Sequence, residues 1–157
     1  MASSTGVNKL SIVNQDSGGV STAFPDVCKT PMSGGPVPIP YSNVALSADT
    51  TQGSVSVRAG GVPFCLKSSS FSTSTGDEPG SVGGVVSGTT KGKAEFINAS
   101  FDVKVEGRGV ARALDLMVHN NRNTPPFPVL QGPVTSGGKG PTEQRCLCCN
   151  APLSGGR

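Results

Sequence analysis

The side chains with the clearest chemistry in this sequence are a single histidine and a small set of thiols. The histidine is His119, and the thiols are Cys28, Cys65, Cys146, Cys148 and Cys149. Structural zinc sites take four thiolate or imidazole ligands, and three cysteines with one histidine form one of the common sets. The paired C-x2-C spacing of zinc fingers is missing here. The residue types therefore favour a zinc site, and the spacing leaves its ligand set open.

Each of these residues also has a purely structural interpretation. Cys65 lies in the apolar stretch 62–66, where a free cysteine is typically a small buried hydrophobic residue. Cys28 suits packing as well as ligation, and His119, followed by two asparagines, suits the capping of a turn. The C-terminal cysteines lie among polar residues, where an exposed thiol is prone to oxidation. These three cysteines indicate a metal site or a docking segment, with a flexible tail as the alternative.

A hydrolase of the Cys–His type is a competing interpretation. Cys28 or Cys65 would be its nucleophile, His119 its base and Asp115 the acid that orients the base. The only histidine would then serve both as general base and as the best metal ligand. The sequence contains no G-x-S-x-G, HExxH or Walker motif. A hydrolase is therefore less favoured than a metal-binding structural protein.

The composition predicts which elements position these residues. The chain has 157 residues, with 22 glycines, 13 prolines, no tryptophan and 34% hydrophobic residues. Glycine and proline cost a helix about 1 and about 3 kcal/mol each, whereas the valines suit strands. We expect one turn-rich, all-β domain with a small core. Such a core gains from a metal ion, because metal-binding free energy becomes folding free energy.

Charge and hydropathy limit the partners and the location. The net charge of +3 is too small for a nucleic-acid-binding surface. No apolar run approaches the ~20 residues of a membrane span, and residues 1–6 lack the features of a secretory signal. We therefore expect a protein that binds no nucleic acid and does not insert stably into membranes. It would be made in the cytoplasm, where its thiols are reduced.

Two stretches alternate with the period of a strand, and each is followed by glycines. They are Ser54–Arg58 and Phe101–Glu106, and each predicts a short hairpin. They superimpose at an offset of 48 residues, which suggests an internal duplication without proving one. The proline-rich segment Phe24–Tyr41 predicts extended chain that packs by its side chains rather than by ladder hydrogen bonds. Residues 1–23 are interpreted as an edge strand or a loosely held arm.

Residues 103–119, VKVEGRGVARALDLMVH, resemble the signature repeat of the PAAR proteins. That repeat has a glycine turn, the tetrapeptide Pro-Ala-Ala-Arg, an aspartate and a histidine. The matching residues here are Gly107, Ala111, Arg112, Asp115 and His119.

The segment from Asp26 and Cys28 to Gly35 resembles the opening motif of the family, with cysteine in place of histidine. The earlier repeat departs from the signature, since it has Phe64 and Lys67 where arginine and aspartate are expected. The wider set of short motifs is similar to the PAAR-like branch found in type VI secretion loci.

The resemblance implies a small conical, pseudo-threefold arrangement of short β-hairpins with extended Pro/Gly-rich segments. Its base would cap the trimeric valine-glycine-repeat spike protein of a contractile injection apparatus. Its apex would hold Zn²⁺ through Cys28, His119 and two of the cysteines at 146, 148 and 149. The resemblance also implies that no reaction is catalysed. The tip would carry effectors or their adaptors from the cytoplasm into a target cell.

The expected organisation is an arm over residues 1–23, a PAAR-like cone over 24–125 and a Pro/Gly-rich tail with the cysteine cluster over 126–157. A small zinc-binding adaptor unrelated to secretion is the alternative function. Its working part would be the cysteine-rich tail.

Overall fold

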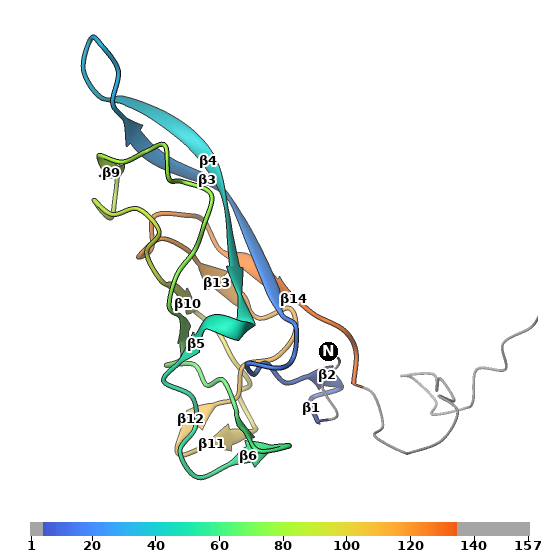
Figure 1. Cartoon of the computed structure of the whole chain (residues 1–157). Helices are drawn as coiled ribbons and strands as arrows, with labels where there is room; N and C mark the ends of the chain where they lie inside the picture. Colours follow the sequence, from blue (N-terminus) through green and yellow to red (C-terminus); the bar gives the residue numbers. More distant parts are fainter. Residues whose placement is uncertain (1–4, 135–157) are drawn as a thin grey trace, which may run out of the picture.

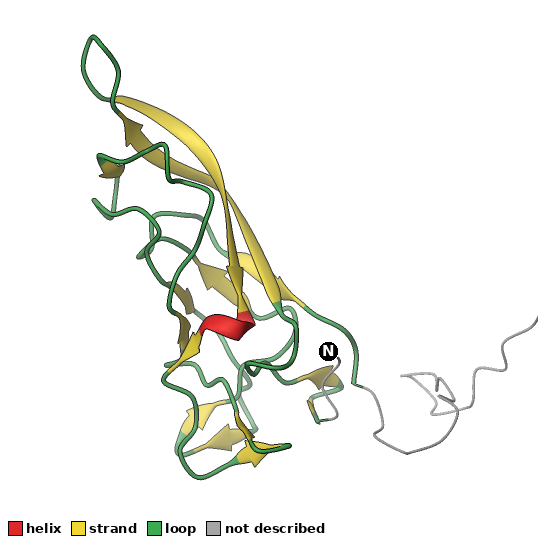
Figure 2. Cartoon of the chain, viewed as in Figure 1, coloured by secondary structure: helices red, strands yellow, loops and turns green. Residues whose placement is uncertain are grey.

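The computed structural model describes residues 5–134, and these residues form an almost entirely β structure. Their single helical element is a three-residue 3-10 helix, η1 (Ser47–Asp49), seen in Figure 2 between much longer stretches of strand and loop. The prediction of an all-β protein is confirmed. Within the described residues, no helix has the length and apolar character needed to cross a bilayer.

The strands form one eight-stranded antiparallel sheet and three separate two-stranded hairpins. The order in the large sheet is β4 (Val37–Leu46), β3 (Val20–Thr30), β14 (Phe127–Leu130), β13 (Leu116–Val118), β10 (Ala94–Phe96), β8 (Ser70–Phe71) and β5 (Thr50–Thr51), and β9 (Gly83–Gly84) also pairs with β3. The hairpins are β1 (Gly6–Val7) with β2 (Leu10–Ser11), β6 (Arg58–Ala59) with β7 (Val62–Pro63), and β11 (Lys104–Val105) with β12 (Arg108–Gly109).

The molecule is elongated, and its two ends differ. The β3–β4 hairpin extends to a narrow end, where β9 lies against it, and the small hairpins lie toward the opposite end (Figure 1). We call the end with the β3–β4 turn, residues 31–36, the apex. We call the end with the three small hairpins the base.

The proline-rich segment was predicted to pack by its side chains without ladder hydrogen bonds, and this prediction is wrong. The segment forms the longest ladder among the described residues. β3 pairs with β4 from Val20–Leu46 to Thr30–Val37, with a register shift between Ala23 and Asp26. The N–H groups of successive strand residues point to opposite sides. Prolines at the alternate positions 36, 38 and 40 therefore remove donors on one side only. Because β4 is an edge strand, this pattern keeps the ladder with β3 and leaves the outer edge without donors at the prolines, while further along the same edge Val44 pairs with Thr75.

The base is built from three related turns closed by a ring of hydrogen bonds. The Val13 N–H donates to the Ala111 carbonyl (3.0 Å), the Ala111 N–H to the Cys65 carbonyl (2.9 Å), and the Cys65 N–H to the Val13 carbonyl (2.8 Å). All three residues are fully buried. Each follows one of the hairpins β1–β2, β6–β7 and β11–β12. The ring therefore relates three structural repeats by pseudo-threefold symmetry.

The ring also corrects the predicted register of the repeats. Cys65 and Ala111 are equivalent, which gives an offset of 46 residues in place of the predicted 48. The reason is that the second turn falls at Glu106–Gly107, two residues before the glycine used in the sequence comparison. Leu66 and Ser69, rather than Phe64 and Lys67, then stand at the positions of Arg112 and Asp115.

The same turn geometry recurs in all three repeats. The Ser69 hydroxyl accepts a hydrogen bond from the Leu66 N–H (2.8 Å), and the Asp115 carboxylate accepts one from the Arg112 N–H (2.7 Å). In the first repeat the Ser17 hydroxyl accepts from the N–H three residues before it (3.1 Å). In each of the three repeats, therefore, a side chain at the same position caps the turn.

The segment interpreted as an arm contains the first of these repeats. Ile12 and Val13 are fully buried, and β1–β2 turns at Asn8 and Lys9, both at positive φ. Two-residue strands are too short to show an alternating pattern, and this turn has no glycine to signal it. Residues 5–17 are therefore part of the folded body.

The core is small, as the composition predicts. One cluster combines small residues with Phe71, Phe96 and Met117, and the two phenylalanine rings meet edge to face with centroids 5.7 Å apart. A second cluster, which includes Ile12, Leu66 and Val110, lies under the base hairpins. Cys65 is fully buried in the first cluster, which confirms its interpretation as a small hydrophobic residue.

Candidate metal centre

Two carboxyl groups and a thiol converge near the apex. The ligand atoms of Asp26, Cys28 and Asp77 all lie within 4.8 Å of one another, and all three side chains are buried. Asp26 and Cys28 are alternate residues of β3, so their side chains share one face. Asp77 begins a turn in which the Gly80 N–H donates to the Asp77 carbonyl (2.9 Å). β3 and this turn therefore position the group.

The glycines of the neighbouring loop allow this close approach. A Cβ atom at Gly80 would lie 2.3 Å from the Cys28 Cβ, which is too close for any side chain. β9 pairs with β3 so that Gly84 lies opposite Cys28. A Cβ at Gly84 would lie 2.5 Å from the Asn123 amide. Backbone without side chains thus covers the thiol.

Asparagine amides surround the group. The amides of Asn43 and Asn123 donate short hydrogen bonds to the Asp26 carboxylate, and the Asn120 amide lies 3.4 Å from the same carboxylate. The Asn120 amide nitrogen is also 3.6 Å from the Cys28 sulfur. The Asp77 carboxylate accepts from one backbone N–H, at 3.0 and 3.1 Å. These donors orient the carboxylates without neutralising their charge.

The electrostatics of the group favour a bound cation. Burial, together with the carboxyl groups of Asp26 and Asp77, raises the pKa of the Cys28 thiol to about 12. Burial also raises the pKa of Asp26, against the opposing effect of the Asn123 and Asn120 hydrogen bonds, and the nearby Asp77 adds to the rise. In the described part of the chain, no lysine or arginine forms an ion pair with either aspartate. The group must therefore bind protons or a cation to stay neutral.

The donor set fits a metal ion. Zinc accepts thiolate sulfur and carboxylate oxygen as ligands, and both are present here with their charge uncompensated. The Asn43 Oδ1 atom is buried and has no hydrogen-bond partner among the described residues. The structure therefore contains a buried Asp–Cys–Asp group able to bind a metal.

The loop that carries Asn120 and Asn123 was missed as part of a site by the sequence analysis. Asn120, Asn121 and Arg122 all have positive φ, a conformation that asparagine tolerates better than most residues. The Asn120 Oδ1 accepts from the Gly92 N–H (2.9 Å). The Asn123 Oδ1 accepts from two backbone N–H groups of the loop after β9, at 2.9 and 3.1 Å. A cluster of asparagines within four residues was the available signal.

His119 lies apart from the group, although it directly precedes Asn120. Its Nε2 is 2.8 Å from the Ser21 hydroxyl, and its Nδ1 is buried without a hydrogen-bond partner in the described region. Burial lowers the pKa of His119 to about 4, so the imidazole is neutral. Of the two predicted zinc ligands that the structure describes, Cys28 is in the group and His119 is not. Cys146, Cys148 and Cys149 lie outside the described residues, so the predicted ligand set stays a prediction.

Four residues of the predicted signature, Gly107, Ala111, Arg112 and Asp115, lie at the base, whereas the Asp–Cys–Asp group lies near the apex. The Arg112 guanidinium binds the Asp115 carboxylate through two hydrogen bonds, at 3.0 and 3.2 Å. A third nitrogen donates to the Asn8 side chain (2.9 Å), which ties the third repeat to the first. Gly107 has a φ of +76° in the β11–β12 turn, and Ala111 belongs to the hydrogen-bonded ring. These residues therefore hold the repeats together.

Comparison with known proteins gives two matches. The family described as the toxin PAAR-like domain matches residues 19–126, more than half of the chain. The DNase toxin Tse7 of Pseudomonas aeruginosa is 41% identical over 153 residues, which cover 90% of this chain and 40% of that protein. The chain thus spans about two-fifths of the length of this relative. No solved structure matches the chain.

These matches correct one expectation and confirm another. The expectation that the protein is not an enzyme is wrong, because a relative with 41% identity is named as a DNase toxin. The resemblance to the PAAR-like branch is confirmed by the family match. It agrees with the three repeats at the base and with the arginine–aspartate pair of the third repeat. The chain belongs to the toxin PAAR-like domain family.

Proposed function

We propose that the protein is the spike-tip domain of a DNase effector that a type VI secretion apparatus delivers. Its base caps the trimeric valine-glycine-repeat spike protein. Its apex leads into the target cell, and zinc stabilises it. The protein is made in the bacterial cytoplasm, assembled on the apparatus and exported with the spike. The family match and the name of the relative support this proposal.

The observation that carries the proposal is the closed ring at the base. A homotrimer presents three identical surfaces around its axis. A single chain can contact all three alike only if it repeats its own surface three times. The ring formed by Val13, Cys65 and Ala111 provides that repetition. A pseudo-threefold base on one chain thus fits a threefold partner.

Apolar residues at equivalent positions give this surface its proposed contacts. Val57 directly precedes β6 and Val103 directly precedes β11, 46 residues later. Each is 37% exposed. Two of the three repeats thus expose an apolar side chain at the same position, and we propose that the spike protein covers both valines.

Co-purification with the spike protein encoded in the same locus tests the capping proposal. We expect one copy of this chain per spike trimer. The double variant Val57→Asp with Val103→Asp should weaken the complex by at least about tenfold, because it places two charges in an apolar contact. Val86→Asp is the matched control, since Val86 is 77% exposed and follows β9 near the apex. The proposal fails if no complex forms at micromolar concentrations.

For the apex we propose that Asp26, Cys28 and Asp77 hold Zn²⁺. The ion would replace the protons that the group otherwise needs, and it would fix β3 against the turn at residues 77–80. Its role would be structural, since its binding free energy adds to the stability of the fold.

Elemental analysis of the purified chain tests the zinc proposal. We expect about one zinc ion per chain, with loss of zinc and a lower melting temperature in Cys28→Ser and in Asp77→Asn. Cys65→Ser is the control: this thiol is also buried, but it contacts the Thr50 hydroxyl (3.3 Å) and not the group. Zinc content that is unchanged in Cys28→Ser and Asp77→Asn would refute this ligand set and leave the fold assignment intact.

A further inference from the structure

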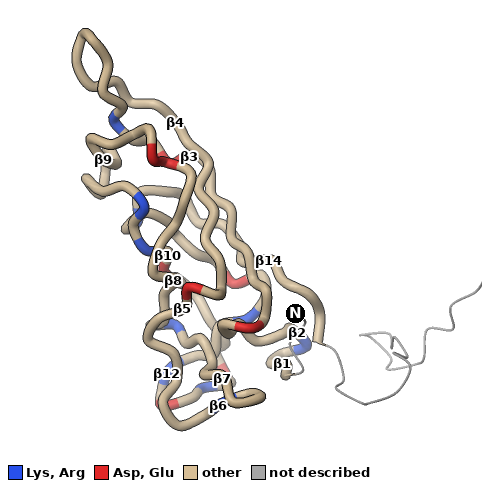
Figure 3. The backbone as a smooth tube through the Cα atoms, in the orientation of Figure 1, with Lys and Arg blue, Asp and Glu red and all other residues tan. Residues whose placement is uncertain are grey.

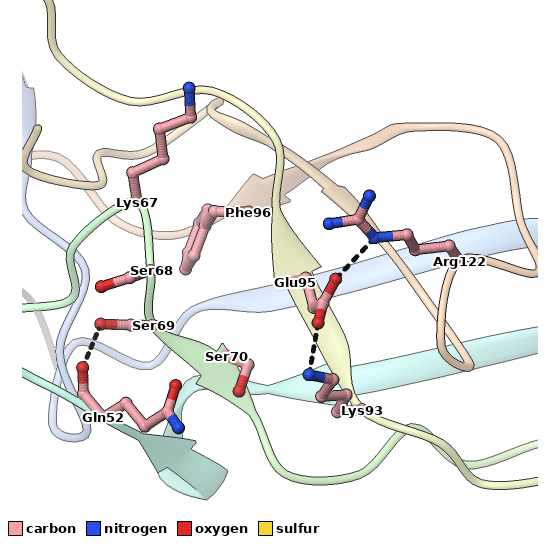
Figure 4. Close-up of a pocket in the computed structure, with 9 residues that line it drawn as sticks. All are labelled: Gln52, Lys67, Ser68, Ser69, Ser70, Lys93, Glu95, Phe96 and Arg122. Atoms are coloured by element: carbon pink, nitrogen blue, oxygen red, sulfur yellow. Dashed lines mark hydrogen bonds and ion pairs between the residues drawn. The ribbon is translucent and has the colours of Figure 1, made fainter.

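A small hollow with a cationic lining lies on the flank between β8 and β10. It has a volume of about 130 Å³, and Ser68–Ser70 form one wall (Figure 4). Glu95 lies opposite and forms ion pairs with Lys93 (2.5 Å) and Arg122 (2.9 Å). These cations hold the pKa of Glu95 below its usual range. Lys67 also lines the hollow.

A larger hollow lies next to it toward the base. It has a volume of about 420 Å³ and shares Lys67 with the first. Ile97 and Phe101 give it an apolar lining, while Lys104 and Arg108 add two more cations. Phe101 is 89% exposed, the largest exposure of any apolar side chain in the described residues. The Arg108 guanidinium donates to the Ser68 hydroxyl (2.6 Å), which joins the lining of the two hollows.

Positive charge exceeds negative charge along these hollows. Charged residues of both signs gather around β8, β10 and β12 (Figure 3). Glu95 and Glu106 neutralise part of this charge, since Glu106 pairs with Arg108 (3.0 Å). Lys67 and Lys104 are exposed and have no ion-pair partner among residues 5–134. Two free ammonium groups thus flank an exposed phenylalanine.

We propose that these two hollows form one groove that binds an extended acidic segment of a partner protein. Carboxylates of the segment would pair with Lys67 and Lys104. An aliphatic or aromatic side chain between them would pack on Phe101 and Ile97. Opposite charge steers and orients such a segment, and burial of the exposed apolar surface stabilises it. The groove would hold a protein cargo on the flank of the tip, beside the base, and this role rests on the proposed function of the chain as a spike tip.

The lining favours a peptide over a nucleic acid. Glu95 and Glu106 would repel a phosphate backbone that ran along the groove, and two free lysines neutralise few phosphates. The apolar part of the lining offers more to a leucine or phenylalanine side chain than to a sugar–phosphate chain. Single-stranded DNA is therefore the competing ligand that the experiment must exclude.

Fluorescence anisotropy with a labelled heptapeptide, Asp-Glu-Leu-Asp-Phe-Glu-Asp, tests the groove on the full chain. We expect binding that weakens as salt rises and falls at least about tenfold in Lys67→Glu with Lys104→Glu. Phe101→Ala should lower the affinity several-fold. Lys29→Glu is the control, because it makes one such lysine-to-glutamate change on β3 near the apex and should bind the peptide normally.

Three results would overturn the proposal. The first is no binding at roughly 1 mM peptide, and the second is equal binding by the variants with altered groove residues. The third is tighter binding of a single-stranded oligonucleotide than of the peptide, which would assign the groove to nucleic acid. Val57→Asp alone, at a residue outside the lining of both hollows, should weaken the spike complex and leave peptide binding unchanged, so a failure of the groove and a failure of the spike proposal are distinguishable.

Discussion

At the scale of single residues, the apex depends on buried polar groups that satisfy one another. Asp26 accepts hydrogen bonds from three asparagines, and Cys28 contacts both aspartates at 3.6 and 3.7 Å. Buried polar groups are costly unless they are paired. The donors of this network are paired, although the Asn43 Oδ1 atom has no partner among the described residues, and such pairing holds the loops in one arrangement. The network explains why a protein with so small a core keeps an ordered narrow end.

His119 predicts a pH dependence of stability. Its pKa is about 4 in the folded protein and about 6.5 in an unfolded chain, so the unfolded state binds more protons between these values. The stabilisation is therefore complete above pH 6.5 and is lost as the pH falls toward 4. The shift corresponds to about 3 kcal/mol. Denaturant unfolding of the chelator-treated protein at several pH values measures this loss.

The variant His119→Gln isolates the contribution of this imidazole. Glutamine can still bond to Ser21 but does not titrate in this range. The loss of stability between pH 7 and pH 4 should be smaller in the variant than in the wild type by about 3 kcal/mol. Equal pH profiles for the two proteins would show that the imidazole is not held neutral by burial.

At the scale of elements, the three capped turns of the base are the repeating unit. Ser17, Ser69 and Asp115 each accept a hydrogen bond from the N–H three residues earlier. In the third repeat the cap is also half of an ion pair, because Arg112 binds Asp115 with two nitrogens. The three turns therefore share a geometry but differ in how strongly they are held.

Removal of the caps should destabilise the protein unequally. Asp115→Ala leaves Arg112 without its partner and should cost about 2–3 kcal/mol. Ser69→Ala should cost about 1–2 kcal/mol, since it removes a buried hydroxyl that accepts from the Leu66 N–H and donates to the Gln52 carbonyl, both of them neutral hydrogen bonds. Ser72→Ala, at an exposed serine three residues further on, should stay within about 0.5 kcal/mol of the wild type. Urea unfolding checks this order, and equal losses for all three variants would contradict it.

At the scale of the whole molecule, the base and the apex carry different structural features. The base carries the pseudo-threefold ring, and the apex carries the candidate metal centre. The β3 strand links the large sheet to the apex: its residue Ser21 pairs with Val129 of β14, and its residue Cys28 belongs to the candidate metal centre. Damage at one end should therefore affect a different step from damage at the other.

Delivery of DNase activity tests this separation. We expect recipient cells to suffer DNA degradation when attacked by cells that carry the wild-type effector. This damage should disappear with Val57→Asp and Val103→Asp in the base, although DNase activity in lysates of the producing cells is unchanged. DNA content of the recipient cells measures the outcome. Undiminished damage by the base variant would contradict a role of the base in delivery.

The sequence by itself determined the all-β class, the small core and the family. These properties follow from local information: glycine and proline content, two alternating stretches and the residues that match the PAAR repeat. The position of the signature arginine and aspartate was also predictable. Their interaction joins residues only three positions apart along the chain.

Only the tertiary structure decided the register of the repeats, the first repeat and the candidate centre. Val13, Cys65 and Ala111 are bonded across offsets of 52 and 46 residues, and no local pattern marks the first of them. Asp77 contacts Cys28 across 49 residues of sequence, a separation that no local pattern predicts. Strand pairing brings such residues together through backbone hydrogen bonds, which depend on register rather than on side-chain type. For that reason the sequence singled out Cys28, whereas the contributions of Asp77, Asn120 and Asn123 followed only from the tertiary structure.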